Sequence, residues 1–360
     1  MTDAEAAALG GRAALEAVLS EAVAHGTVPG GVLLVGGAED AWEPVAAGVR
    51  RYGGAQVDAT TRYDLASLTK VVGCLSAFLR LLDAGELRLD DPVRRFFSNA
   101  GWFQDPSLGD VRLEALATHT SGLPAWRPLF AQVGDRRTGL ANVLQTPLEG
   151  PAGHYRYSDV GVMVLTAVIE RAAGERLDAF LRREVFEPLG MRSTGYGPVP
   201  GEVPVAATED DGLRGGVLEG VVHDENAWVL DGVSGHAGLF APAADLLAYG
   251  RAWLRLDAPF ASERWLSEAL VDRSAGQGPR RGLLWRLAQV DWPFGDGVSA
   301  RAFGHTGFTG TSLVVDPEQG WVTVLLTNRV HPSRERGAGI EGLRRRVHRV
   351  VADGYAGAAP

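Results

Sequence analysis

The chain has 360 residues, of which 46% are hydrophobic and 22% are charged, a composition typical of a globular enzyme. Its formal net charge of −9 argues against nucleic acid as a partner, because a surface that binds nucleic acid needs an excess of basic groups. The length is that of two domains, or of one large domain with an insertion.

The single cysteine and the N-terminus bear on the cellular compartment. One cysteine, Cys74, excludes an internal disulfide, and we expect a small buried core residue rather than a reactive thiol. The first residues are acidic and no apolar run follows them, so no secretory signal is visible. Apolar runs such as 160–169 are too short to span a bilayer. We therefore expect a cytoplasmic protein without a membrane span.

The N-terminal part of the chain predicts a helix, two strands and a second helix. Apolar spacing indicates a helix over 4–25, and strands are predicted over 32–35 and 42–49. The second helix, 67–82, has apolar residues around most of its circumference, so we expect it to be central and buried.

The middle of the chain is predicted to be mostly helical. Helices are expected over 113–118, 160–173, 177–187 and 243–254. Residues 196–216 are rich in proline, glycine and acids, and they predict a long surface loop.

Strands return in the last part of the chain. They are predicted over 283–287, 301–305, 311–315 and 322–327, and an arginine-rich helix over 338–353 follows them.

Strands at both chain ends favour an α/β (α+β) fold, in which one antiparallel sheet is assembled from both ends and flanked by helices. Residues 1–65 and 275–360 would form this sheet domain. Residues 66–274 would form an inserted, mostly helical domain. We expect the active site in the cleft between the two, a usual place for ligands.

The only lysine of the chain is Lys70; the other 34 of the 35 basic residues are arginines. The guanidinium of arginine stays protonated in proteins, whereas a desolvated lysine can lose its proton and act as a base. Ser67 lies three residues earlier, one helical turn away, so its hydroxyl is expected beside the amine. The pair predicts a serine nucleophile with a lysine base.

Two later motifs accompany the segment 67–70. Residues 157–159 read Tyr-Ser-Asp, and residues 305–307 read His-Thr-Gly. With these three motifs the chain resembles the class C β-lactamase and D-alanyl-D-alanine carboxypeptidase family of serine hydrolases, which includes esterases. It departs from the family's Tyr-x-Asn by its Asp159, and from Lys-Thr-Gly by its His305.

The resemblance implies roles for the residues that match the motifs. Ser67 would be acylated, and Lys70 and Tyr157 would share the proton transfers. The backbone N–H groups of Ser67 and Phe308 would form the oxyanion hole. No cofactor and no metal are expected.

The other matched residues would act on substrate. His305, Thr306 and Gly307 would line the cleft and orient the substrate, a small ester, amide or peptide. Asp159 stands where an amide normally bonds to substrate, or it holds Lys70 or a loop in place; a plain helix N-cap is an equal alternative. A neutral His305 would weaken a fixed positive charge for substrate carboxylates.

Polar residues outside the motifs leave several alternatives open. The loop 119–124 is either a polar wall of the cleft or a simple turn. His223, Asp224, Asn226 and His236 are expected to fix loops by hydrogen bonds rather than to line the cleft. The two histidines with Asp224 are the only candidate ligands for a metal hydrolase.

The predicted function is that of an esterase or a small D-peptide hydrolase acting through an acyl-enzyme. A β-lactamase or DD-carboxypeptidase acting on cell-wall substrates is the alternative, and a non-catalytic penicillin-fold binding module is a further one. An α/β-hydrolase is rejected, because the nearest match to Gly-x-Ser-x-Gly, at 232–236, ends in histidine. The oligomeric state and the physiological substrate are left open.

Overall fold

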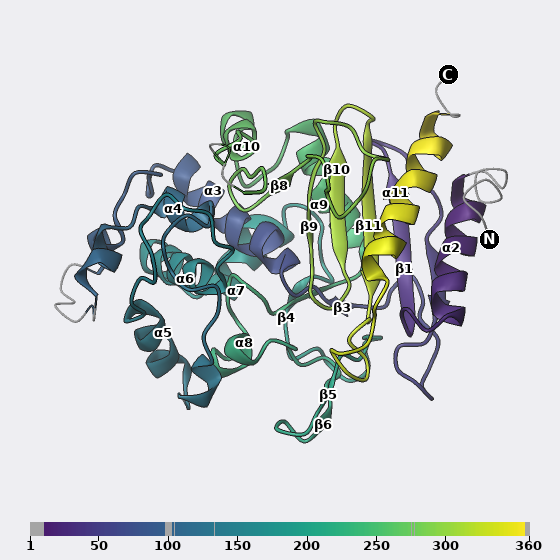
Figure 1. Ribbon diagram of the computed structural model, residues 1–360, viewed down its shortest axis with the longest axis horizontal. Helices are drawn as coiled ribbons and strands as arrows, with labels where there is room; N and C mark the ends of the chain where they lie inside the picture. Colours follow the sequence, from purple (N-terminus) through teal and green to yellow (C-terminus); the bar gives the residue numbers. More distant parts are fainter. Residues whose placement is uncertain are drawn as a thin grey trace.

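The computed structural model describes residues 11–97, 103, 105–132, 134–274, 276 and 278–356. Its main element is a six-stranded antiparallel sheet of order β2-β1-β11-β10-β9-β8, so the strands of the two chain ends are neighbours, as Figure 1 shows. The predicted α/β (α+β) fold with a sheet built from both ends is confirmed. The strands are β1 (Gly30–Gly36), β2 (Val45–Gly48), β8 (Arg286–Leu287), β9 (Phe303–Thr306), β10 (Ser312–Asp316) and β11 (Trp321–Thr327).

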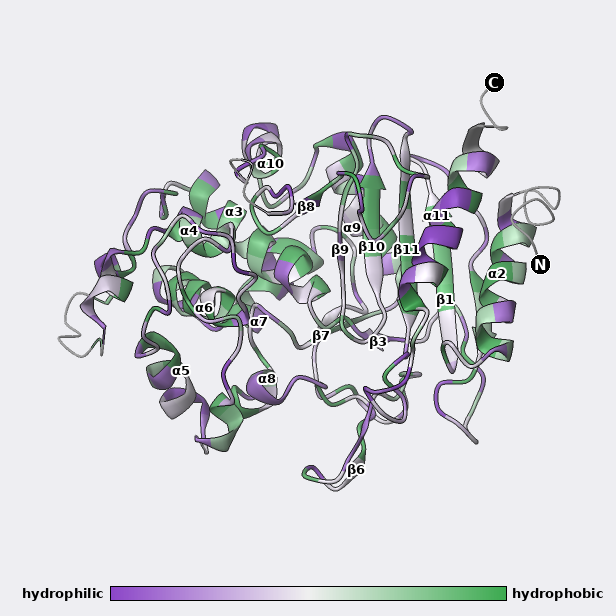
Figure 2. Cartoon of the chain, in the orientation of Figure 1, coloured by the Kyte–Doolittle hydropathy of each residue, from purple (hydrophilic) through white to green (hydrophobic). Residues whose placement is uncertain are grey.

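The central strand β1 is buried on both faces. Leu33 and Val35 pack in one cluster with α2 (Gly11–Ala24) and α11 (Ile340–Ala356). Val32 and Leu34 pack in the other, beneath α9 (Ala243–Arg255). Because side chains alternate across a strand, a strand covered on both faces needs an unbroken apolar run. Figure 2 accordingly shows hydrophobic colouring along the sheet and hydrophilic colouring on the outer side of α11.

The helical part surrounds α6 (Asp159–Ala173), which is buried along most of its length. Its α-helices are α3 (Ser76–Asp83), α4 (Leu113–Ala117), α5 (Arg136–Leu144), α6, α7 (Leu177–Leu181), α8 (Glu225–Val229) and α10 (Glu263–Ala269). Shorter helical segments are η1 (Lys70–Leu75), η2 (Val93–Arg95), η3 (Pro106–Asp110), η4 (Leu129–Ala131) and η5 (Arg182–Phe186). Helix α9 comes from the predicted helical domain yet packs on the sheet, so we propose to count it with the sheet domain. The rest of the two-domain division stays a prediction.

Two small sheets complete the fold. One joins β3 (Tyr63–Asp64), β7 (Leu239–Ala241) and β4 (Gly195–Tyr196), and the other joins β5 (Asp210–Asp211) to β6 (Gly216–Val217). Strand β3 ends three residues before Ser67, so this three-stranded sheet positions the start of the segment 67–70.

Several predicted elements need correction. The helix expected over 67–82 begins with the π-helical segment η1 and continues as α3. The strand expected over 283–287 is reduced to β8, because Leu284 has a left-handed φ of 57° that a strand does not allow. The loop expected over 196–216 contains β5 and begins and ends in strand residues. The first residues of the helix expected over 4–25 lie outside the described residues.

In the part of the chain that the structure describes, every helix is too short or too polar to span a bilayer.

Candidate active site

A tight turn carries Ser67. Strand β3 ends at Asp64, whose Oδ1 accepts a hydrogen bond of 2.8 Å from the N–H of Ala66. Ala66 has a left-handed φ of 45°, which is uncommon outside glycine. The chain then becomes helical, and the N–H of Lys70 donates to the carbonyl of Ser67 at 3.1 Å. Ser67 therefore lies at the start of a helical segment, half-buried at the edge of a cavity.

The segment η1 lets a neighbouring loop approach Lys70 closely. A Cβ on Gly235 would lie 2.9 Å from both Cβ and Sγ of Cys74, so only glycine fits there. This close approach brings the carbonyl oxygen of His236 to 3.0 Å from Lys70 Nζ. Cys74 is fully buried, as expected, and burial raises the pKa of its thiol to about 12.

Three oxygen atoms surround the Lys70 ammonium. Nζ lies 2.9 Å from Ser67 Oγ, 3.0 Å from the carbonyl oxygen of His236 and 2.7 Å from Asp159 Oδ1. The lysine side chain has no exposed surface, whereas 21% of the Asp159 side chain is exposed. Two of these contacts are hydrogen bonds donated by Nζ, and the contact with Asp159 is an ion pair.

The charge of Lys70 depends on two opposing effects. Burial by itself would lower the pKa of Lys70. The carboxylate of Asp159, and after it the phenol of Tyr157, outweigh burial and raise the pKa of Lys70 above its ordinary value. The expectation that burial leaves a neutral amine therefore fails in the resting site, because Asp159 replaces the family's neutral amide.

Asp159 is the first residue of α6. The N-cap is Ser158, whose Oγ accepts a hydrogen bond of 2.9 Å from the N–H of Gly161. The alternative in which Asp159 is a plain N-cap is therefore wrong. Its carboxylate is instead paired with Lys70.

Tyr157 forms the wall beside Lys70. Its ring centroid lies 5.1 Å from Nζ, and the ring lies 4.5 Å from that of His119 and 6.1 Å from that of His305. His119 Nδ1 accepts a hydrogen bond of 3.1 Å from the N–H of Ser158. The first residue of the loop 119–124 thus supports both the tyrosine and the segment that carries it.

His305 is a neutral residue of the cleft wall. Burial, together with the positive charges of Arg281 and Lys70, lowers the pKa of His305 well below its ordinary value. Its Nδ1 lies 2.9 Å from the carbonyl oxygen of Thr306, so Nδ1 carries the ring proton. The fixed positive charge that the family's lysine would supply is therefore missing at this position.

The turn after β9 is packed against the turn that carries Ser67. A Cβ on Gly307 would lie 2.5 Å from the carbonyl oxygen of Leu65, so a side chain has no room there. Thr309 Oγ1 donates to the carbonyl of Asp64 at 2.7 Å, and Thr311 Oγ1 donates to that of Leu65 at 3.1 Å. These contacts hold residues 307–311 beside the nucleophile.

The two backbone N–H groups expected in an oxyanion hole lie in these turns. Across the described residues, neither the N–H of Ser67 nor that of Phe308 donates a hydrogen bond to a protein acceptor. Both residues line one cavity of about 400 Å³. The other predicted residues that line it are Tyr157, His305, Thr306 and Gly307. Lys70 and Asp159 are not among its lining residues and lie behind Ser67.

Comparison with known proteins agrees with this geometry. The family model described as Beta-lactamase matches residues 15–345. The chain belongs to the beta-lactamase family. The resemblance drawn from the three motifs is thereby confirmed, and the relatives of this beta-lactamase-family protein are hydrolases.

Two relatives and one solved structure illustrate the range of the family. A protein of Escherichia coli O157:H7, provisionally named D-alanyl-D-alanine carboxypeptidase, is 33% identical over 304 residues, which cover 75% of this chain and 70% of that protein. An N-acetylmuramyl-L-alanine amidase of Bacillus subtilis is 31% identical over 320 residues, which cover 77% of this chain and 70% of that protein. The solved structure of EstCE1, described as a hydrolase with promiscuous acyltransferase activity, has a TM-score of 0.75 at 21% identity. The match covers 97% of this chain and 99% of EstCE1, and it shows the shared fold.

Sequence motifs did not predict the arginines of the cavity in this beta-lactamase-family protein. Two of them are held by the protein. Arg329 stacks on Phe308, with its guanidinium carbon 4.7 Å from the ring centroid, and donates to the carbonyl of Phe308. Arg344 is buried and donates to the carbonyl of Gly307 at 3.2 Å. Both therefore fix the turn that carries Phe308, whose N–H is one of the two expected in an oxyanion hole.

The other two arginines of the cavity are Arg281 and Arg286. Arg281 lies over the Tyr157 ring at 5.3 Å and donates from Nε to the hydroxyl of Tyr155. Arg286 has a buried Nε that, within the described residues, has no hydrogen-bond partner. With 34 arginines spread along the chain, no spacing could have marked these two as cavity residues.

The cluster of Asp224, Ser234 and His236 lies behind Lys70. His236 Nε2 is 2.8 Å from Asp224 Oδ1, and Nδ1 is 2.7 Å from Ser234 Oγ. Asp224 also caps α8 by accepting from the N–H of Ala227. Asn226 joins α8 to the segment 127–130 by bonding to the backbone of residues 127 and 130. The expected loop-fixing role is confirmed for these side chains.

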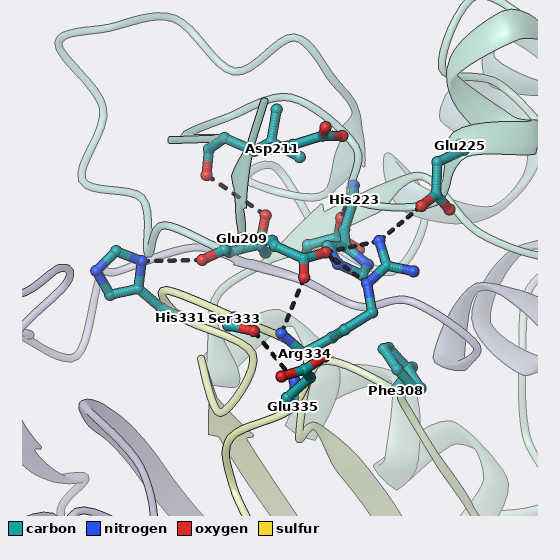
Figure 3. Close-up of polar contacts among 12 residues, drawn as sticks. Glu209, Asp211, His223, Glu225, Phe308, His331, Ser333, Arg334 and Glu335 are labelled. Atoms are coloured by element: carbon teal, nitrogen blue, oxygen red, sulfur yellow. Dashed lines mark hydrogen bonds and ion pairs between the residues drawn. The ribbon is translucent and has the colours of Figure 1, made fainter. Parts of the chain in front are cut away.

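His223 belongs to a separate ionic cluster, shown in Figure 3. Its Nε2 lies 2.9 Å from Glu209 Oε2, and Arg334 donates to the same carboxylate from its backbone N–H and from Nε. Arg334 also pairs with Glu225 at 2.6 Å. The ring of His223 stacks on Phe308 at 5.8 Å, so this cluster supports the rim of the cavity.

The two histidines considered as metal ligands thus have different carboxylate partners. Among the residues that the structure describes, no group of three or more His, Cys, Asp or Glu is arranged to hold a metal ion.

Proposed function

We propose that this protein is a serine hydrolase that forms an acyl-enzyme on Ser67 from an ester or amide substrate. The observation that carries the proposal is the distance of 2.9 Å between Ser67 Oγ and Nζ of the only lysine, at the edge of an open cavity. A serine hydroxyl needs such a neighbour to become a nucleophile. The family match over residues 15–345 supports the reaction class.

The surrounding groups fit the steps of acyl transfer. The free N–H groups of Ser67 and Phe308 would stabilise the oxyanion that forms when Ser67 attacks a carbonyl carbon. Tyr157 would pass a proton between Lys70 and the leaving group, since it lines the cavity and lies beside Nζ. Water would then hydrolyse the acyl-enzyme by the same groups acting in reverse.

An esterase or a small D-peptide hydrolase is the activity that we favour. The neutral His305 argues against an efficient β-lactamase, because no fixed charge at this position would hold a substrate carboxylate. A DD-carboxypeptidase is the second candidate. It is supported by the relatives that carry this name and by Arg281 and Arg286, which could bind a terminal carboxylate.

Hydrolysis of p-nitrophenyl butyrate, nitrocefin and a peptide ending in D-alanyl-D-alanine tests the proposal. Wild type should turn over at least one of these substrates, and Ser67→Ala should turn over none. Mass spectrometry of wild type treated with a fluorophosphonate should find the label on Ser67. An unlabelled Ser67 and the lack of any turnover would instead favour the non-catalytic binding module.

A further inference from the structure

The contacts of Lys70 raise a problem for its role as a simple base. Its ammonium donates hydrogen bonds to Ser67 Oγ and to the carbonyl oxygen of His236, and it forms an ion pair with Asp159. An ammonium cannot take the proton of Ser67 unless it gives up one of its own. The site therefore needs a second acceptor in contact with Lys70.

We propose that Asp159 is that acceptor: it takes up the proton of Ser67 during acylation, with Lys70 as the relay between them. The inference rests on the proposed function, since it describes a proton path for the same acylation. It assigns Asp159 a catalytic step in place of the substrate contact expected from the family's amide.

The geometry supports a relay. Asp159 Oδ1 lies 2.7 Å from Nζ, which in turn lies 2.9 Å from Ser67 Oγ, so one nitrogen contacts both ends of the path. Oδ1 is buried from solvent, so water does not compete for the proton at this atom. Tyr157 presents its ring to the same nitrogen at 5.1 Å, and its effect on the charge of Lys70 is smaller than that of Asp159.

The proposed step conserves protons and charge. One proton moves from Nζ to Asp159 Oδ1, which leaves a neutral amine and a neutral carboxyl. Rotation about the Cε–Nζ bond turns the amine lone pair toward Ser67. The Oγ–H proton passes to Nζ while Oγ bonds to the carbonyl carbon, whose π electrons move to its oxygen. Lys70 is again an ammonium, and Asp159 holds the proton.

Collapse of the intermediate reverses the path. The oxyanion electrons re-form the C=O bond, and the bond to the leaving group breaks. The leaving group takes a proton from the ammonium, directly or through Tyr157, and Asp159 returns its proton to Lys70. The resting ion pair is restored before water attacks.

Asp159 occupies a helix position that favours a negatively charged side chain. As the first residue of a helix of 15 residues, it lies at the positive end of the helix dipole. Its own N–H donates to the carbonyl of Ala125 at 2.9 Å, which fixes the backbone.

Other ionisable groups near the pair do not replace it. Burial lowers the pKa of both His119 and His305 well below the ordinary value, so both are neutral. Burial would raise the pKa of Asp224, but His236 outweighs it and lowers that pKa. The remaining groups that face the pair are the phenol of Tyr157, the guanidinium of Arg281 and the thiol of Cys74.

The experiment is a pH profile of kcat/KM on an ester that wild type turns over, for wild type and Asp159→Asn. Asp159→Asn restores the family's amide with nearly the same shape, so it should fold. We expect it to lose about 100-fold in kcat/KM near neutral pH. Its acid limb should move to higher pH by more than about one unit, because the reaction then requires neutral Lys70. Activity within about 3-fold of wild type with an unmoved acid limb would overturn the inference.

Two further variants keep the test decisive. Asp159→Glu keeps a carboxylate and should keep the acid limb of wild type at a lower rate; an acid limb displaced as in Asp159→Asn would contradict the relay. Glu263→Gln is the matched control, since Glu263 is also an acid at the first position of a helix, α10, but is exposed, and it should match wild type. If wild type is inactive on every substrate and Ser67 is not labelled, the proposed function fails, and the relay with it. If Ser67 is labelled and only Asp159→Asn behaves as wild type, the relay alone fails.

Discussion

Two buried ionic clusters of this protein have similar members but different surroundings. In one, Lys70 pairs with Asp159, and in the other, Glu209 pairs with His223 and Arg334. The first lies directly behind Ser67, a half-buried hydroxyl on a cavity. In the second, each carboxylate oxygen of Glu209 is bonded to protein donors.

The difference shows when a cluster of charged groups can take part in proton transfer. When each charged group has fixed protein partners, the cluster stabilises the loops that it joins. It then contains no further group that could accept a proton. A cluster that ends on a reactive group at a cavity has a path for a proton. Variants should therefore affect turnover at the first cluster and stability at the second.

The largest effect is expected from Lys70→Arg. The variant keeps the positive charge, but its guanidinium neither gives up nor accepts a proton, so kcat/KM on an active ester should fall by about 1,000-fold or more. Rates and thermal melts of wild type and variant would be compared side by side. A folded Lys70→Arg protein with near-normal turnover would refute any proton-transfer role for Lys70, whether as base or as relay.

A loss of stability is expected from Glu209→Gln. Removing the carboxylate leaves His223 without its partner, whereas Arg334, whose side chain is 40% exposed, keeps Glu225. The change should therefore cost about 1–2 kcal/mol of unfolding free energy. Urea unfolding measures this cost. Turnover at a temperature where both proteins are folded should change much less than for Lys70→Arg. A variant as stable as wild type but inactive would reverse the assignment of the two clusters.

The fold was more predictable than the partners within the site. Predicted strands at both chain ends, such as 32–35 and 322–327, were sufficient to predict one antiparallel sheet built from both ends. Strand 283–287 was overestimated, because the left-handed Leu284 interrupts it and leucine itself gives no sign of this. Ser67, Lys70, Tyr157 and 305–308 were found because their motifs are local in sequence.

What local motifs could not predict is contact between distant residues. The pairing of Asp159 with Lys70 joins residues 89 positions apart, and the carbonyl of His236 comes from 166 positions away. The cavity arginines carry no local signal at all. The site roles themselves stay predictions until variants are measured.

Arg286→Gln is expected to change the ratio of KM for a charged peptide to KM for an uncharged ester by about 10-fold, a smaller effect. If the unpartnered guanidinium binds a substrate carboxylate, KM should rise for a peptide with a free C-terminus and stay unchanged for an uncharged ester. The matched control is Arg301→Gln, an exposed arginine that does not line the cavity. Equal changes in KM for the charged and uncharged substrates would mean that Arg286 shapes the cavity and does not bind the substrate carboxylate.

The smallest effect is expected in the pH dependence of stability. Burial by itself would raise the pKa of Glu209, but hydrogen bonds from His223 and Arg334 outweigh it and lower that pKa below 4.5, its ordinary value. A carboxylate with a depressed pKa in the folded state stabilises the protein above the ordinary pKa, and this stability is lost as the pH falls. Wild type should therefore lose more stability than Glu209→Gln when unfolding is followed from about pH 6 down to about pH 3. If the unfolding free energies of wild type and Glu209→Gln changed equally with pH, the Glu209 cluster would add nothing to stability, like a surface ion pair. The two clusters would then differ only in their effect on turnover.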